Sequence, residues 1–182
     1  MAATRPPIDR AFLRSWSGIP QAVGHQAGWW ACVIWMGWQG PLAMALFLGV
    51  HAWCTRTHWR SETKLVAASA LVGIVLDNAL AMGGFVEYEG SITVGLTPLW
   101  LVGIWAGFGA TLRHSQRVLV ASRRSALLTG SLGGPLAYWG GERLERLTVD
   151  DPVGWLAVSL TWTVALWVLQ HLAASSGPNA NG

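Results

Sequence analysis

Long apolar stretches, separated by short polar segments, account for most of the chain. An α-helix rises 1.5 Å per residue, so about 20 apolar residues cross the ~30 Å hydrocarbon core of a bilayer. Four stretches reach that length, the second is shorter and the fifth is rich in glycine. The pattern predicts an all-α, polytopic transmembrane bundle with six spans, at Pro20–Trp38, Pro41–Cys54, Lys64–Gly84, Pro98–Arg117, Ser125–Gly141 and Pro152–Ala173.

The fifth stretch is the least regular of these. Gly130, Gly133, Gly134 and Pro135 weaken a helix there, and a re-entrant segment is the alternative to a full crossing. Because Pro135 has no N–H to donate, we expect the backbone carbonyl of Ser131 to lack its helical partner.

Two connecting segments carry patterns of their own. Phe85–Thr97 alternates with a period of two about Gly90-Ser91, which predicts a short hairpin. Glu142–Leu147 resembles a short interfacial amphipathic helix. The chain thus divides into a basic N-terminal segment at 1–19, a membrane domain at 20–173 and a polar tail at 174–182 that we expect to be disordered.

Composition supports a membrane protein and excludes other classes. Hydrophobic residues make up 52% of the 182 and charged residues only 12%, against roughly 25% charged in ordinary soluble domains. Disordered chains are charged and poor in aromatic residues, whereas this chain has 13 Trp. Two Cys are too few for a disulfide scaffold.

The basic residues predict the orientation. If all six stretches cross, ten of the twelve Lys and Arg fall on one side, and only Arg143 and Arg146 fall on the other, among six acidic residues. By the positive-inside rule, both termini are then cytoplasmic. A re-entrant fifth segment would instead place the C-terminus outside. The net charge of +3 therefore reflects topology, and we expect no nucleic-acid partner.

Small residues predict where the helices pack, because they let two backbones approach closely within a membrane. Their stripes on the third and fourth stretches place Asp77 and His114 against protein rather than lipid. Small residues stand four apart at Gly24 and Gly28, Gly103 and Gly107, and Gly130 and Gly134.

Most Trp residues fit an aromatic belt at the membrane interfaces. Four fall nearer the middle of the predicted spans, where a belt does not explain them: Trp29, Trp30, Trp105 and Trp162. We expect these four to pack against the glycine stripes or to line an apolar pocket.

An ionisable residue inside a span is costly and marks a candidate site. Asp77, followed by Asn78, lies roughly 20 Å from the boundary at Lys64 by the helical rise, and Tyr138 comes out at a similar depth. Together with Ser131 they form a candidate polar pocket. The Asp77 carboxyl is either a proton acceptor or ligand anchor, or a hydrogen-bonded group that fixes helix register.

Histidines form a second pattern, because His25, His51, His114 and His171 fall in the cytoplasmic third of their spans, and His58 lies in the adjoining loop. Metal or haem ligation is one interpretation. However, no paired His motif is present, and no carboxylate lies on these stretches at that depth. We therefore predict no metal and no cofactor.

The neighbours of these histidines suggest a different cytoplasmic site. Gln26 stands beside His25, and Arg113 beside His114 opens a basic cluster that could hold a phosphate or an acidic lipid head group. The alternative is that the cluster only keeps its loop inside. Asp77 and His114 differ in depth by roughly 13 Å, so they are not expected to act as a pair.

Four short motifs, in this order, resemble a bacterial inner-membrane family known as domain of unknown function 2878. The resemblance covers about Pro20–Ala173 and implies a multi-pass protein of the bacterial inner membrane, with a fifth span that crosses. It implies no assigned activity, only a loose association with fatty-acyl modification. The motifs are Gly24-His-Gln-Ala-Gly-Trp-Trp, Gly73-Ile-Val-Leu-Asp77, Pro98-Leu-Trp-Leu-Val and Gly133-Gly-Pro-Leu-Ala-Tyr138.

Three functions fit these residues, and whether the chain is an enzyme stays open. The first is a protein that binds membrane lipid, an acyl chain or an isoprenoid chain as an accessory to lipid modification, with few polar residues in its spans. The second is a small proton-coupled transporter or flippase that uses Asp77. The third is an assembly factor that binds a membrane-protein partner, or a second copy of itself, through its glycine faces.

Overall fold

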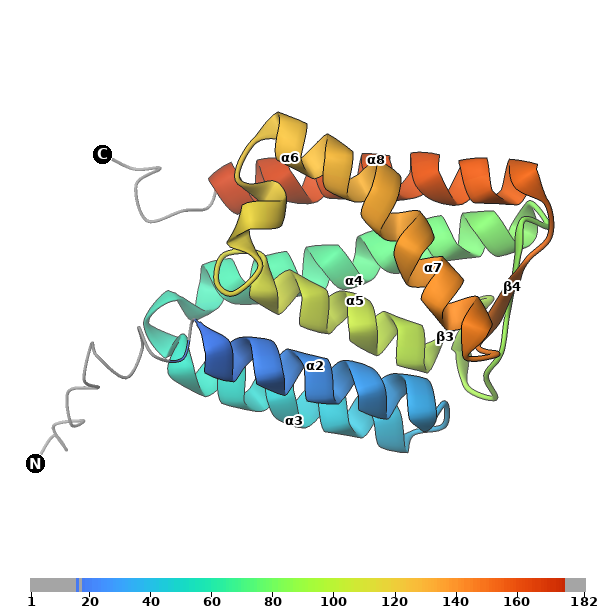
Figure 1. The fold of residues 1–182 in the computed structure, drawn as a ribbon. Coiled ribbons are helices and arrows are strands. Elements are labelled where there is room, and N and C mark those ends of the chain that lie inside the picture. Colours follow the sequence, from blue (N-terminus) through green and yellow to red (C-terminus); the bar gives the residue numbers. More distant parts are fainter. Residues whose placement is uncertain (1–15, 17, 176–182) are drawn as a thin grey trace, which may run out of the picture.

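The computed structural model describes Trp16 and residues 18–175, and the chain is mostly helical, as predicted. Successive helical segments run in alternate directions along one bundle (Figure 1). Short strands lie at one end of it, and α8 ends at the other (Figure 1). The predictions for 1–15 and for 176–182 lie outside the described residues.

A helical hairpin forms one side of the bundle. Helices α2 (Ile19–Ile34) and α3 (Gln39–Cys54) pack side by side, joined by a tight turn. Gly40 permits that turn, because a Cβ there would collide with the backbone of Trp35 and Cys32. Helix α2 ends four residues before the predicted boundary at Trp38.

The centre of the bundle is the pair α4 (Trp59–Met82) and α5 (Leu99–Thr111). After the short helix η1 (Arg56–His58), α4 begins five residues before the predicted Lys64 and so includes Glu62. Helix α5 ends well before the predicted Arg117, because the chain turns back after Thr111, whose carbonyl accepts from His114 and Gln116.

The glycine-rich fifth stretch is one continuous helical segment that runs the length of the bundle (Figure 1). It consists of α6 (Arg123–Leu128), a π-helical turn η3 (Thr129–Gly133) and α7 (Gly134–Arg143). The carbonyl of Ser131, which Pro135 cannot satisfy, accepts from the Ser159 hydroxyl at 3.0 Å. That bond attaches the irregular turn to α8 (Pro152–Ser175), which packs alongside.

The strands differ from the prediction. Strand β1 (Val86–Tyr88) pairs with β4 (Leu147–Val149), which lies between α7 and α8, and not within its own loop. The hairpin in this loop is β2 (Thr93–Val94) with β3 (Thr97–Pro98), so its turn is at Gly95-Leu96 rather than at Gly90-Ser91. Gly95 has φ +66°, a conformation that favours glycine.

The prediction of an amphipathic helix at Glu142–Leu147 is also wrong, since α7 ends at Arg143 and β4 begins at Leu147. The reason is tertiary: Leu147 and Val149 join Val86 in a buried apolar cluster at this end of the bundle. A period of two shows that a strand is present, but it does not select the partner strand.

Two segments of the described chain, Arg56–Met82 and Pro152–Ser175, are long and apolar enough to cross a membrane. Helices α2 and α3 have 16 residues each and α5 has 13, fewer than the ~20 of a straight crossing. The prediction of a helical bundle is therefore confirmed, while six crossings remain a prediction.

Candidate functional site

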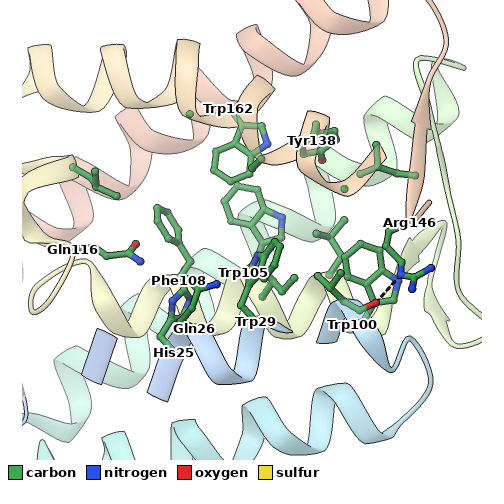
Figure 2. A pocket seen from close by; sticks show the side chains of 18 of the residues that line it. His25, Gln26, Trp29, Trp100, Trp105, Phe108, Gln116, Tyr138, Arg146 and Trp162 are labelled. Atoms are coloured by element: carbon green, nitrogen blue, oxygen red, sulfur yellow. Dashed lines mark hydrogen bonds between the residues drawn. The ribbon is translucent and has the colours of Figure 1, made fainter. Parts of the chain in front are cut away.

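An elongated groove lies between α2 and the α6–η3–α7 segment, with α5 as its floor (Figure 2). Its cavity of about 280 Å³ is close to the smallest volumes typical of ligand pockets, ~300 Å³. Most of its wall is apolar or aromatic, with polar side chains concentrated toward its two ends (Figure 2). The labelled lining residues are His25, Gln26, Trp29, Trp100, Trp105, Phe108, Gln116, Tyr138, Arg146 and Trp162.

Glycines bring the aromatic wall together. Trp105 of α5 lies directly against Gly73 of α4, and Trp162 of α8 lies against Gly134, where a Cβ would collide with each ring. The two indoles then pack on each other, with ring centroids 4.6 Å apart and planes inclined by 31°. Trp105 and Trp162 thus fulfil both halves of the prediction, since they contact glycines and line a pocket.

Not every predicted mid-span Trp lies there. Trp29 also lines the groove, whereas Trp30, its neighbour on α2, points away and is 45% exposed. The glycine pairs are likewise used within the chain: Gly28 and Gly107 lie against Met44, and Gly130 lies against the backbone of Thr163.

Behind the groove, Asp77 is 1% exposed and accepts three hydrogen bonds. Its Oδ1 accepts from the hydroxyls of Tyr138 at 2.5 Å and Tyr88 at 3.4 Å. Its Oδ2 accepts from Trp105 Nε1 at 2.8 Å. The carboxyl of α4 is therefore bonded to α5, α7 and β1 at once, and two of its donors, Trp105 and Tyr138, form part of the groove wall.

The sequence paired Asp77 with Tyr138 correctly but missed Tyr88 and Trp105. Tyr88 lies 3.0 Å from the hydroxyl of Tyr138, so the three groups form one network. Burial, and then the neighbouring Asp77 carboxylate, raise the pKa of the Tyr88 phenol well above its usual range. Tyr88 therefore remains a hydrogen-bond donor.

Asn78 and Ser131, the other two predicted members of this pocket, lie elsewhere. Asn78 holds the β2–β3 hairpin: its Nδ2 donates to Thr97 Oγ1 at 2.7 Å and its Oδ1 accepts from the backbone N–H of Leu96 at 2.6 Å. The hydroxyl of Ser131 donates to its own helix, at the carbonyl of Leu128. Adjacent positions on a helix point in different directions, so sequence proximity to Asp77 does not place Asn78 with it.

A second buried carboxylate, Glu62, lies near the opposite end of α4. Its Oε2 is 3.1 Å from His114 Nε2 and 3.4 Å from His51 Nε2, and its Oε1 is 3.4 Å from an Arg113 guanidinium nitrogen. Three of the predicted cytoplasmic-side residues thus meet around a residue the sequence did not single out. The signal was missed because α4 was expected to begin after Glu62.

The nitrogens of His51 and His114 and an oxygen of Glu62 lie within 4.8 Å of one another, a spacing that could hold a metal ion. The partner of the other ring nitrogen argues against a metal ion bound to His51. A metal-bound histidine normally donates its other ring N–H to an acceptor. What faces Nδ1 of His51, at 3.1 Å, is the side-chain nitrogen of Gln21, a donor.

The orientation of the Gln21 amide is fixed by two backbone groups. Its Oε1 accepts from the N–H of Ser115 at 3.0 Å, and its Nε2 donates to the carbonyl of Ala110 at 3.0 Å. If the amide were flipped, its NH₂ group would face the N–H of Ser115 and its oxygen would face the carbonyl of Ala110. Neutral His51 therefore carries its proton on Nε2, toward Glu62, and offers no lone pair there to a metal.

His25 and Gln26 do not join this cluster. They lie one helical turn further along α2 than Gln21 and face the groove (Figure 2). The predicted cytoplasmic-side group therefore separates into two: the cluster around Glu62, and a polar end of the groove. Asp77 and His114 belong to different networks, as the depth estimate predicted.

The fold and the site define the kind of protein: a helical bundle with an aromatic groove along its side and a hydrogen-bonded carboxylate behind the groove. The chain belongs to the family described as "Protein of unknown function (DUF2878)", whose model matches residues 19–168. That match includes the whole groove and both carboxylate clusters. No curated protein and no solved structure matches the chain.

Proposed function

We propose that this protein is an integral membrane protein that binds a single acyl or isoprenoid chain in the groove. The observation that carries the proposal is the groove itself, with its aromatic wall and its position between two helical segments on the side of the bundle. A chain that lies in a bilayer would enter such a groove sideways.

Exposed apolar side chains support the membrane setting. Leu46 on α3, Leu71 on α4 and Leu160 on α8 are 67%, 61% and 58% exposed, and many others resemble them. Only 28% of the best 18-residue window is buried in each of the two long apolar segments. Core helices of a soluble protein would be covered, whereas lipid covers such faces in a membrane.

The shorter helices are compatible with this setting. Helices α2 and α3, at 16 residues, rise about 24 Å, and a bilayer thins locally around short spans at a modest cost. The basic loops α3–α4 and α5–α6 lie at one end of the bundle, and the strands, with most of the acidic residues beside them, lie at the other (Figure 1). The positive-inside rule then favours a cytoplasmic location for the first end.

The groove accommodates a stretch of chain rather than a whole lipid. On α2 it extends from His25 to Val33, about 12 Å by the helical rise. Carbon–carbon bonds of ~1.5 Å at ~111° advance about 1.25 Å each, so roughly ten carbons fit.

Native mass spectrometry of the full chain, extracted in a mild detergent, tests the proposal. We expect a co-purifying species whose mass fits a single-chain lipid and which organic extraction recovers. A protein that remains empty, both as purified and after incubation with total membrane lipid, would contradict chain binding. Labelling of single cysteines placed in the α3–α4 loop and beside β4 tests the orientation separately.

A further inference from the structure

The groove wall contains three buried polar atoms that have no hydrogen-bond partner within the described chain. They are Nε2 of His25, Oε1 of Gln116 and Nε1 of Trp162. A buried polar atom without a partner destabilises the empty protein, so such atoms are rare in native structures. A ligand in the groove is able to supply partners to such atoms.

Two of the three belong to side chains in the half of the groove away from Arg146 (Figure 2). His25 comes from α2, and Gln116 from the turn after α5, next to Phe108 (Figure 2). His25 is only 6% exposed, and its side chain is aimed into the groove (Figure 2). The Gln116 side chain points toward the groove from the side nearer the α5–α6 loop (Figure 2).

The chemistry of these atoms restricts what they can bind. Gln116 Oε1 accepts a hydrogen bond, and an imidazole nitrogen of His25 donates one when it carries the proton. A hydroxyl has both functions, since it can accept a hydrogen bond from His25 and donate one to Gln116. Trp162 Nε1 can only donate, and it takes no part in this assignment.

The charge of the wall argues for a neutral group. Arg146 is the one Arg or Lys among the residues described as lining the groove, and it stands at the opposite end (Figure 2). Its Nε already donates to the carbonyl of Val33 at 2.6 Å. An anionic head group beside His25 would be buried without a fixed positive partner, which is costly.

We propose that the chain bound in the groove carries an uncharged hydroxyl at the His25–Gln116 end, as in a long-chain alcohol or an un-ionised carboxylic acid. This inference rests on the proposed function, because it specifies the ligand of the same groove. It places the polar end of the chain toward the α5–α6 loop, with the apolar part extending along Trp105 toward Arg146.

Matched ten-carbon probes test this in detergent-solubilised full-length protein: 1-decanol, decanoic acid at pH 5 and pH 9, decyl phosphate, and decane. Each is compared at equal mole fraction in the micelle by the rise of the melting temperature. We expect 1-decanol to bind about tenfold more tightly than decane, the effect of one or two hydrogen bonds. Decanoic acid should match the alcohol at pH 5 and lose its advantage at pH 9.

Two variants connect that preference to the residues. His25→Leu and Gln116→Met should each reduce the preference for 1-decanol over decane several-fold while decane binding persists. His171→Leu, at an exposed histidine of α8 outside the groove, is the control and should leave the preference unchanged. Should a variant fail to fold, the comparison of probes on the native chain still decides.

The outcomes separate the two proposals. If decane and 1-decanol bind equally, the groove holds a chain but the hydroxyl assignment is wrong. If decyl phosphate binds best, the polar end is anionic and the inference is overturned. If no probe raises the melting temperature, both this inference and the proposed function fail.

Discussion

Asp77 and Glu62 are buried carboxyl groups on the same helix, yet they are satisfied in opposite ways. Asp77 accepts from two phenols and an indole, all neutral donors. Glu62 faces an arginine and two histidines, so its charge is compensated by an ion pair. They stand about 22 Å apart along α4 by the helical rise.

The difference shows how position decides the partner. Glu62 lies near a helix end, beside the basic turn that follows α5, where the guanidinium of Arg113 is available. Asp77 lies deep in the bundle, where hydroxyl and indole groups cost less to bury than a positive charge. The first cluster closes one end of the bundle, whereas the second holds the wall of the groove in place.

The largest expected effect is at Asp77. Asp77→Ala removes the shared acceptor of three donors and should lower the free energy of unfolding by about 3–5 kcal/mol, because only one of the two tyrosine hydroxyls can donate to the other instead. Asp77→Asn keeps one carbonyl oxygen and should cost less. Unfolding in mixed micelles of dodecyl sulfate and a mild detergent measures both. A loss under about 1 kcal/mol for Asp77→Ala would show that the network does not hold the wall.

Substitution of Glu62 should have the second largest effect on the free energy of unfolding. Glu62→Gln removes the charge that Arg113 and the histidines face, and we expect a loss of about 1–3 kcal/mol in the same unfolding measurement. Glu87→Gln, at an exposed glutamate of β1, is the matched control and should change little. Equal effects of the two substitutions would mean that the Glu62 cluster is no more than a surface ion pair.

Tyr88 and Tyr138 sharpen the comparison within the Asp77 network. Tyr88→Phe should cost about 1 kcal/mol, because its hydroxyl is 3.4 Å from the carboxyl and Tyr138 remains. Tyr138→Phe should cost more, since its contact is 2.5 Å and fully buried. The reverse order would indicate that β1, rather than α7, is the main support of Asp77.

The smallest expected effect is that of added metal. Because the Gln21 amide keeps a proton on His51 Nε2, Zn²⁺ at tenfold excess over the protein should leave the melting temperature unchanged. A rise with Zn²⁺ that disappears in both His114→Ala and Glu62→Gln would overturn this tautomer assignment and make the Glu62 cluster a metal site.

Periodicity and residue type predicted the main features of the fold. Helical spacing placed Asp77 on a protein-facing side and at the depth of Tyr138, and small residues predicted the close contacts at Gly73 and Gly134. The pairing of β1 with β4 joins residues about sixty positions apart, and alternation alone carries no information on such a partner.

The candidate site was predicted only in part, for a similar reason. Charged residues surround Glu62, which is typical of a loop, so the sequence does not predict its position between His51 and His114. Helix α4 nevertheless begins at Trp59 and includes it. The groove depends on how α2, α5, α8 and the α6–η3–α7 segment pack, and no local pattern in the sequence encodes a cavity. Its aromatic wall was nevertheless indicated by Trp residues in the middle of the spans.

The central claim is that the groove holds a chain, and one pair of substitutions tests it most directly. Gly133 and Gly140 lie on the same helical segment, and a Cβ would meet one ordinary contact at the first and none at the second. Only Gly133 lines the groove. Gly133→Leu should therefore fill the cavity, and Gly140→Leu should not.

Native mass spectrometry of both variants, beside the unsubstituted chain, gives the answer. We predict that the amount of co-purifying lipid falls at least tenfold in Gly133→Leu, relative to the unsubstituted protein, and is unchanged in Gly140→Leu. Both variants should have the melting temperature of the unsubstituted protein. Equal retention of the lipid in the two variants would contradict the account, because the chain would then be bound outside the groove.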